Sequence, residues 1–325
     1  MKPKVLVTRE VFDETLEYLA QYCEVESNQP DAPLSPQRLA ERLKDKDGAV
    51  CALTDRIDEQ LLAGCPGLKA VCNIAVGYNN IDVAACTARG VMVTNTPGVL
   101  DDATADLAWA LILSTARRIT EAEAYLRNGE WKGWYLKQLL GVNVHRATLG
   151  IIGMGRIGQA IARRAAGFEM RVLYHNRRRV APEIEQRLNA TYVSKEELLE
   201  RSDFVVLQVP YSAETHHLIG AAELKKMKRS AILVNSTRGG VVDDAALIEA
   251  LANGTIRAAG LDVFENEPRF NPEFLKLKNV VLVPHIGSST EATRRAMAMT
   301  AAKNLVAALT TGDPPNLVNP EVRKR

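Results

Sequence analysis

The sequence predicts an α/β fold built from two doubly wound parallel-sheet domains. Short apolar runs alternate with helix-like stretches along most of the chain, which is typical of parallel sheets covered by helices on both faces. A glycine pattern at residues 153–158 lies between one such run and a helix-like stretch, as in domains that bind dinucleotides. At 325 residues, the chain is also longer than one compact core usually holds.

The first series of alternating elements ends at the turn Thr96–Gly98. Its expected strands are brief apolar runs of the kind that parallel sheets bury on both faces. We expect strands at Val5–Val7, Ala49–Leu53, Ala70–Asn73 and Val91–Thr94. We expect helices at Val11–Gln21, Gln37–Lys44, Glu59–Ala63 and Val83–Arg89.

The second series starts near Thr148 and has the six strands of a dinucleotide-binding sheet. We expect these strands at Leu149–Ile152, Arg171–Tyr174, Phe204–Leu207, Ala231–Asn235, Ala258–Leu261 and Val280–Val283. We expect helices at Ile157–Ala166, Lys195–Ser202, Ala221–Met227 and Asp244–Ala252.

A long helical stretch lies at each edge of the second series, from Asp101 to about Arg127 and from Thr290 to Leu309. This arrangement predicts that a Rossmann nucleotide domain is inserted into a flavodoxin-like substrate domain, with the chain crossing between them twice. We expect the nucleotide domain at residues 101–287 and the substrate (catalytic) domain at residues 1–100 and 288–325.

Composition excludes several classes of function. The net charge of +2 with 25% charged residues favours neither nucleic acid nor a membrane surface as partner, so the expected ligand is a small molecule. The cysteines are odd in number and lack zinc-site spacing, so we expect reduced thiols and no metal. The N-terminus lacks the apolar core of a signal peptide, and no window is apolar enough for a membrane span. We therefore expect a cytoplasmic protein.

The pattern Gly153-Met154-Gly155-Arg156-Ile157-Gly158 predicts a phosphate-binding turn. The first glycine makes the tight turn, the second lets the backbone approach a pyrophosphate, and the third lets helix and strand pack closely. The N–H groups at the start of the helix then bind the phosphates. A glycine-rich turn that serves only packing is the alternative.

The end of the next strand indicates which nicotinamide cofactor binds. An NAD site usually has a carboxylate there for the ribose 2′-hydroxyl. This chain instead has Asn176-Arg177-Arg178-Arg179. Arginines bind a 2′-phosphate through charge-assisted hydrogen bonds, so NADP(H) is favoured over NAD(H), with a solvated basic loop as the alternative.

Three segments that follow successive strands carry residues suited to reducing a 2-oxo acid. Arg238 can hold a carboxylate and polarise a carbonyl. His285 can act as the general acid near neutral pH, and Glu267 can orient that histidine. Taken singly, each residue has a structural alternative. Arg238 could form a surface ion pair, Glu267 could cap a helix and His285 could be an ordinary loop histidine. Their occurrence together at strand ends favours catalysis.

At this point the chain resembles the D-isomer-specific 2-hydroxyacid dehydrogenases, most of all the bacterial glyoxylate/hydroxypyruvate reductases, some of which also reduce 2-ketogluconate. The matching segments are Val76–Asp82, Asn95–Gly98, Gly150–Gly158, Asn235–Gly239, Gly260–Pro268 and Pro284–Ser288. The resemblance implies NADPH-dependent reduction of glyoxylate, hydroxypyruvate or 2-ketogluconate by hydride transfer, with Arg238, Glu267 and His285 as the catalytic set.

The resemblance also implies the remaining sites. Substrate binding is expected at Val76, Gly77, Arg238, His285 and Ser288. Cofactor binding is expected at Gly153, Gly155, Arg156, Ile157, Gly158, Asn176, Arg177, Arg178 and Asp262. Family members are usually homodimers, which makes Asp101–Arg127 the expected contact helix. Trp134 is a candidate for closing a partner's pocket, although its surroundings depart from the family and favour core or interface packing.

Other functions remain as alternative hypotheses. A 3-phosphoglycerate dehydrogenase or another D-2-hydroxyacid dehydrogenase would share the catalytic set, but many of the former carry a C-terminal regulatory domain for which this chain leaves no room. Phosphite and formate dehydrogenases share the fold. NAD(H)-sensing corepressors keep the catalytic set but have long disordered tails. We expect an enzyme.

Overall fold

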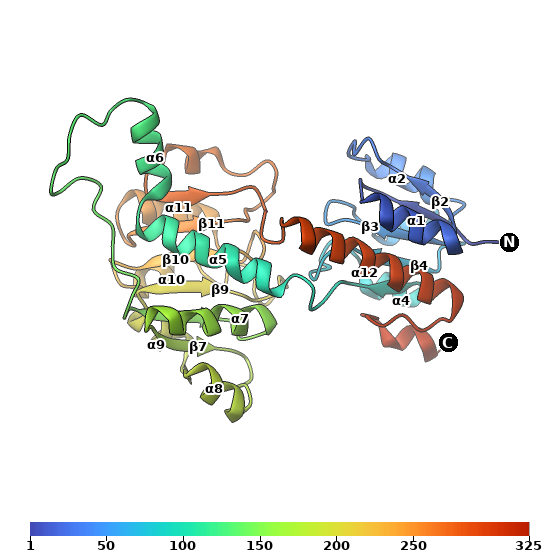
Figure 1. The fold of residues 1–325 in the computed structure, drawn as a ribbon. Coiled ribbons are helices and arrows are strands. Elements are labelled where there is room, and N and C mark those ends of the chain that lie inside the picture. The colour runs from blue at the N-terminus through green and yellow to red at the C-terminus, as the bar shows by residue number, and fades with distance from the viewer. Residues whose placement is uncertain (325) are drawn as a thin grey trace. The chain divides into compact units, whose positions relative to one another are not determined.

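The computed structural model describes residues 1–324, and the chain folds into two compact units (Figure 1). Unit 1 consists of Met1–Leu100 together with Ser289–Arg325. Unit 2 is the continuous segment Asp101–Ser288. Each unit contains one parallel sheet, so the α/β class predicted from the sequence is confirmed.

Unit 1 has a five-stranded parallel sheet in the order β2-β1-β3-β4-β5, which is the flavodoxin-like order. Its strands are β1 Lys4–Val7, β2 Glu24–Ser27, β3 Gly48–Cys51, β4 Ala70–Asn73 and β5 Met92–Thr94. Its α-helices are α1 Asp13–Tyr22, α2 Pro36–Leu43, α3 Glu59–Ala63, α4 Val83–Ala88 and α12 Glu291–Thr310. A short 3₁₀ helix, η3 Pro320–Lys324, follows α12.

Alternate side chains of this sheet pack into two separate cores. Val5 and Val7 of β1 face the core formed with α1 and α12, whereas Leu6 faces the core formed with α2, α3 and α4. This alternation follows from the two-residue period of a strand and explains why the strands are apolar on both faces. All five cysteines are buried in this unit as free thiols, as the sequence predicted: Cys23, Cys51, Cys65, Cys72 and Cys86.

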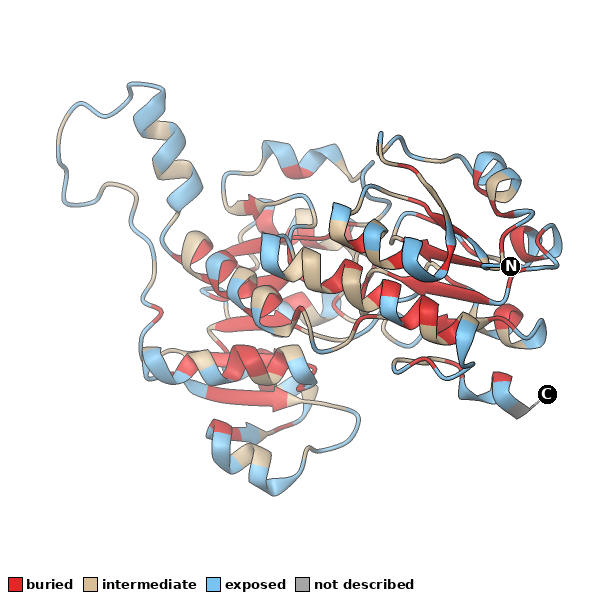
Figure 2. Ribbon diagram, turned by 45° about the vertical axis from the view of Figure 1, so that its right-hand side comes forward, coloured by how far each residue is buried: buried red, intermediate tan, exposed pale blue. Residues whose placement is uncertain are grey.

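Unit 2 has a seven-stranded parallel sheet in the order β12-β11-β10-β9-β6-β7-β8. Its strands are β6 Thr148–Ile152, β7 Arg171–His175, β8 Ala190–Tyr192, β9 Phe204–Leu207, β10 Ile232–Asn235, β11 Ala258–Leu261 and β12 Val280–Leu282. The order reverses between β6 and β9, which is the switch point of a Rossmann sheet. The central strands are buried along their length (Figure 2).

Helices cover both faces of this sheet. The α-helices of unit 2 are α5 Asp101–Ala116, α6 Ile119–Arg127, α7 Arg156–Ala165, α8 Pro182–Leu188, α9 Lys195–Arg201, α10 Ala221–Lys226 and α11 Asp244–Ala252. Its 3₁₀ helices are η1 Ala166–Phe168 and η2 Pro272–Lys276. Buried side chains of α5 and α7 form one core, and those of α9, α10 and α11 form the other. The second sheet is therefore doubly wound as well.

The structure differs from the sequence prediction in several elements. It adds helix α8 and two short strands, β2 and β8, each at the edge of its sheet. The helix expected from Asp101 to Arg127 is two helices, because Arg118 adopts a left-handed conformation with φ of 53°. Within residues 1–324, no helix has the length and apolar character needed to cross a membrane.

Candidate active site

The site begins at one edge of the unit 2 sheet. Strands β10, β11 and β12 are neighbours and run parallel, so their carboxyl ends lie at the same edge. Arg238 follows β10, Asp262 follows β11 and His285 follows β12. Ligands of doubly wound sheets bind outside these ends. The topology therefore brings the strand-end residues together, as the sequence predicted.

The turn that carries Arg238 is shaped by Asn235. Its Oδ1 accepts hydrogen bonds from the backbone N–H and the hydroxyl of Thr237, at 3.1 and 2.8 Å, and its Nδ2 donates to the carbonyl of Arg238. Gly239 packs so closely that a Cβ there would lie 1.7 Å from the carbonyl oxygen of Phe264. These contacts fix where the Arg238 side chain leaves the backbone.

Arg238 is half-buried and lies within the field of two carboxylates. Burial lowers the pKa of Arg238, whereas the negative charges of Glu267 and Asp262 raise it. A guanidinium that has already lost part of its hydration, and that still carries its charge, is suited to binding an anionic group.

His285 is paired with Glu267. Its Nδ1–H donates to Oε1 of Glu267 at 2.7 Å, and the two side chains are 28% and 33% exposed. The backbone of His285 is left-handed, with φ of 51°, an uncommon conformation for a non-glycine residue. The pairing leaves Nε2 of the ring as the nitrogen available to a ligand.

Asp262 anchors the segment that contains His285. Its carboxylate is buried and accepts hydrogen bonds from the backbone N–H groups of Ile286 and Gly287, at 2.6 and 2.9 Å. Burial raises the pKa of Asp262 to about 6, and these hydrogen bonds and the charge of His285 oppose the increase. Asp262 was expected to bind cofactor; in the structure both of its oxygens bind the loop.

The glycine turn between β6 and α7 has the geometry expected of a phosphate cradle. Gly153 has φ of 107°, and a Cβ on it would lie 2.2 Å from the carbonyl oxygen of Gln208. A Cβ on Gly158 would lie 2.1 Å from the carbonyl oxygen of Gly153. At Gly155, the N-cap of α7, a Cβ would meet nothing within 4 Å. The space in front of Gly155, with Arg156 and Ile157 opening the helix, therefore fits a pyrophosphate.

The three arginines that follow β7 differ in their ion-pair partners. Arg179 forms a bidentate ion pair with Glu185, in which Nε and Nη2 donate to the two carboxylate oxygens at 2.7 and 2.6 Å. This pair lowers the pKa of Glu185 to about 2. Arg178 is exposed, and Arg177 makes an exposed ion pair with Glu214 at 3.0 Å. Such an exposed pair contributes little.

Asn176 lies beside the glycine turn. Its Oδ1 accepts a hydrogen bond from the backbone N–H of Met154 at 2.6 Å. Asn176 therefore ties the end of β7 to the turn itself, and Arg177 and Arg178 follow directly after it.

Val76 and Gly77 lie in unit 1, in the loop after β4. Asn95 donates to the carbonyl of Val76 at 2.8 Å, and Asn73 donates to the carbonyl of Gly77 at 2.9 Å. Asn80, in the same loop, donates to the carbonyl oxygens of Ala52 and Asp55 and so ties this loop to the one after β3. The carbonyl groups of the loop are thus tied to the protein, which orients its backbone.

Two further residues singled out from the sequence, Ser288 and Trp134, are not part of the hydrogen-bond networks described above. Ser288 is half-buried and is the last residue of unit 2. Trp134 is 78% exposed, so of the two expected roles, core and interface packing, the first is wrong and the second stays a prediction. It lies in the segment that follows α6, which extends away from the sheet of unit 2 (Figure 1).

Sequence reasoning did not identify Asn235 or the anchoring contacts of Asp262. Asparagine at the end of a strand commonly bonds its own backbone two residues on, so an Asx turn was a usable signal for Asn235. No pattern in the sequence indicates that the carboxylate of Asp262 accepts from residues 286 and 287, because the pairing depends on how β11 and β12 align.

Comparison with known proteins shows the family to which the chain belongs. Residues 109–287 match the family model described as D-isomer specific 2-hydroxyacid dehydrogenase, NAD binding domain. The chain is 51% identical to a glyoxylate reductase of Thermococcus litoralis, over 99% of this chain and 98% of that protein.

Solved structures agree as well. One is an NADPH-dependent glyoxylate/hydroxypyruvate reductase from Sinorhizobium meliloti in complex with NADP and malonate, with a TM-score of 0.88, 35% identity and coverage of 99% of this chain and 98% of that one. Another is a glyoxylate reductase from Paecilomyes thermophila, with a TM-score of 0.88, 34% identity and 99% coverage of both chains. The chain belongs to the D-isomer specific 2-hydroxyacid dehydrogenases, a family of NAD(P)-dependent enzymes.

Proposed function

We propose that this chain uses NADPH to reduce small 2-oxo acids, glyoxylate and hydroxypyruvate among them, to the corresponding 2-hydroxy acids, with D configuration where the product is chiral. The observation that carries the proposal is the His285–Glu267 hydrogen bond at 2.7 Å, beside a half-buried Arg238. These are the three groups that carbonyl reduction of a 2-oxo acid requires of a protein: a proton donor, a group that orients it and a cation for the carboxylate.

His285 is the proposed general acid. Because Nδ1–H donates to Glu267, the ring presents Nε2–H to the substrate oxygen. The carboxylate of Glu267 holds the ring in this orientation through the hydrogen bond. Asp262 holds the backbone just after His285, so the ring is positioned from both sides.

Arg238 is the proposed carboxylate-binding residue, and it also polarises the carbonyl. The backbone N–H groups of Val76 and Gly77 are the proposed second binding groups for the carboxylate. Support comes from the loop itself, in which side-chain amides tie the carbonyl groups of both residues. Ser288 remains a proposed substrate contact.

The cofactor is proposed to bind along Gly153–Gly158, with its 2′-phosphate on Arg177 and Arg178. When bound, the reduced nicotinamide supplies the hydride that adds to C2 of the substrate. Arg177 and Arg178 are exposed, whereas the third arginine, Arg179, is already bound by Glu185. The stretch Tyr174–Arg179 contains no carboxylate that would repel a phosphate. The Sinorhizobium meliloti relative is described as NADPH-dependent, which supports this preference.

The test follows absorbance at 340 nm for purified protein with NADPH or NADH and a panel of glyoxylate, hydroxypyruvate and 2-ketogluconate. We expect NADPH to be oxidised with glyoxylate and hydroxypyruvate, and NADH to react more slowly. Tight NADPH binding without turnover of any 2-oxo acid would refute the proposed reaction and favour a cofactor-sensing role. Equal rates with NADH would refute only the proposed arginine contact.

A homodimer is the proposed assembly. Within the expected contact range Asp101–Arg127, α5 buries its apolar residues against its own sheet, which favours the α6 part of the range. More than half of the exposed large hydrophobic side chains in residues 1–324 instead lie between residues 119 and 140. They are Ile119, Leu126, Trp131, Trp134, Tyr135, Leu136 and Leu140.

An exposed apolar surface of this kind typically marks a protein–protein contact. We therefore place the proposed interface on α6 and the segment after it. Light scattering should give twice the mass of one chain. A monomer at micromolar concentration would contradict the assembly without affecting the proposed reaction.

A further inference from the structure

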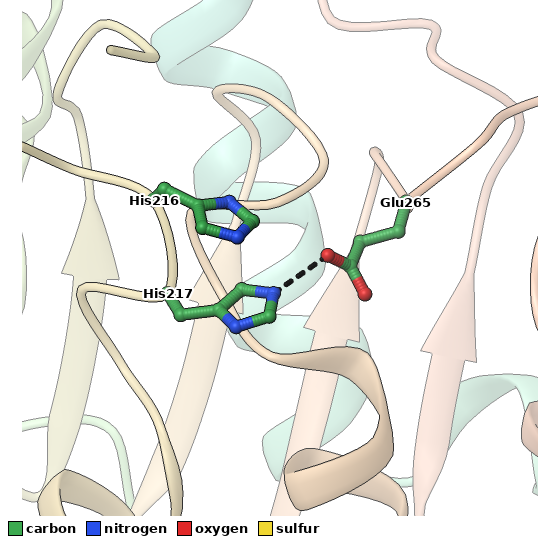
Figure 3. Close-up of side chains that lie close together, drawn as sticks. All are labelled: His216, His217 and Glu265. Atoms are coloured by element: carbon green, nitrogen blue, oxygen red, sulfur yellow. Dashed lines mark hydrogen bonds and ion pairs between the residues drawn. The ribbon is translucent and has the colours of Figure 1, made fainter. Parts of the chain in front are cut away.

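A second group of histidine and carboxylate side chains lies outside the residues used above. His216 and His217 lie on the segment between β9 and α10, and Glu265 lies on the segment after β11 (Figure 3). One nitrogen of each ring and one carboxylate oxygen lie within 4.8 Å of one another. Nε2 of His217 already lies 2.7 Å from Oε1 of Glu265. The cysteine pattern predicted no metal, and this group contains no cysteine.

The outer nitrogens of both rings have oxygen partners. Nδ1 of His216 lies 3.2 Å from the hydroxyl of Tyr211. Nδ1 of His217 lies 3.8 Å from a carboxylate oxygen of Asp243, which is close enough for an ion pair but too far for a hydrogen bond. Histidines that bind metals almost always hydrogen-bond their other ring nitrogen to an oxygen, and of these two contacts the one to Tyr211 is short enough to do so.

The backbone of the cluster is held independently of its side chains. His217 has φ of 49°, and its N–H donates to the carbonyl of Gly240 at 2.7 Å. The N–H of Glu265 donates to the buried carboxylate of Asp244 at 3.0 Å. Two of the three side chains therefore project from a fixed backbone, which reduces the ordering that ion binding would require.

We propose that His216, His217 and Glu265 form a binding site for one divalent transition-metal ion with the ligand preference of zinc. The ligands are Nε2 of each histidine and a carboxylate oxygen of Glu265, and a fourth position is left to water. Two imidazoles and one carboxylate suit Zn²⁺, Co²⁺ or Ni²⁺ and disfavour Mg²⁺ or Ca²⁺, which prefer oxygen ligands.

The geometry needs one adjustment. Tetrahedral ligands at about 2.1 Å from zinc are about 3.4 Å apart, so the cluster must contract from its present spread. The two rings are stacked, with centroids 3.9 Å apart and planes inclined by 25°, and one ion cannot lie in both planes until one ring turns. His216 is the exposed ring, so it is the one that rotates, and its present contact with the hydroxyl of Tyr211 must then be remade or given up. Rotamer changes of exposed side chains are fast and cost little.

Occupancy would have a structural consequence. The ion would join the segment before α10 to the segment after β11. The second segment carries both the ligand Glu265 and, two residues later, Glu267. The first segment is already bonded through His217 to Gly240, in the turn after Arg238. The ion therefore joins two segments of the folded chain and raises the unfolding temperature as its concentration increases.

The experiment uses full-length protein stripped with a chelator and then titrated with Zn²⁺ by calorimetry and with Co²⁺ by visible absorption. We expect one ion per chain and a Co²⁺ spectrum of tetrahedral rather than octahedral type. His216→Ala and Glu265→Gln should each weaken binding by at least tenfold. His145→Ala is the matched control, because His145 is an exposed histidine outside the cluster, and binding should be unchanged.

His285→Ala separates this site from the proposed active site. Unchanged Zn²⁺ binding in that variant, together with loss in His216→Ala, supports the proposal. Loss of binding in His285→Ala, or full binding in both His216→Ala and Glu265→Gln, overturns it. The absence of saturable Zn²⁺ binding to the wild-type protein, checked as folded by circular dichroism, also overturns it.

Discussion

Replacement of Glu267 tests the proposed proton donor most directly. Glu267→Ala removes the acceptor of the 2.7 Å hydrogen bond from Nδ1 of His285, and Glu267→Gln keeps an acceptor but removes its charge. Hydrogen bonds to charged groups contribute about 1.5–3 kcal/mol. Because both side chains are about one-third exposed, we take the lower part of this range, about 1.5–2 kcal/mol.

A loss of about 1.5–2 kcal/mol in the transition state corresponds to roughly a 10- to 30-fold decrease in kcat/KM. We expect this decrease for Glu267→Ala with glyoxylate and NADPH, followed at 340 nm, and a smaller one for Glu267→Gln. The Kd for NADPH should be unchanged, because Glu267 accepts its hydrogen bond from His285 and not from the glycine turn. The control is Glu249→Gln, an exposed carboxylate on α11. A kcat/KM for Glu267→Ala within twofold of wild type would refute the role of this pair.

Three further predictions concern the cofactor site and folding. Arg177→Ala combined with Arg178→Ala should raise the KM for NADPH by at least tenfold and leave that for NADH unchanged; a parallel increase for both would refute 2′-phosphate binding. Gly155→Val should fold but lose the thermal shift caused by NADPH, whereas Gly158→Ala should lower the free energy of unfolding by about 1–3 kcal/mol, because its Cβ would lie 2.1 Å from a carbonyl oxygen. Burial raises the pKa of Asp262 from 3.8 to about 6, so its ionisation destabilises the folded state. The protonated form of Asp262 therefore stabilises the folded state below pH 4, and about 3 kcal/mol of the free energy of unfolding is lost as the pH rises to 6. Denaturant unfolding of Asp262→Asn at several pH values should lack this pH-dependent loss.

The strands that the sequence predicted best are those buried on both faces. Phe204–Leu207 and Ala258–Leu261 coincide with β9 and β11, where every residue is buried. The strands it missed, β2 and β8, pair on one side only and are short or polar. An edge strand needs no continuous apolar run, because half of its backbone and most of its side chains stay in contact with water.

The break between α5 and α6 could not be predicted for a different reason. The residues around Arg118 include neither glycine nor proline, the usual signals for the end of a helix. The guanidinium of Arg118 instead bonds the carboxylate of Glu121 at 2.7 and 2.8 Å while its backbone turns left-handed. Helical periodicity continues through this point, so a prediction based on periodicity alone joins the two helices.

The segment after β11 shows why the sequence identified the residues of the site more readily than the role of each residue. Three carboxylates occur within six residues, and the sequence alone gives them the same chemistry. Asp262 is buried and binds backbone N–H groups, Glu267 accepts from His285, and Glu265 pairs with His217. Their partners lie on segments that come together only when β9, β10, β11 and β12 align. A carboxylate's function here is therefore set by its partner and its burial, and both are properties of the folded sheet.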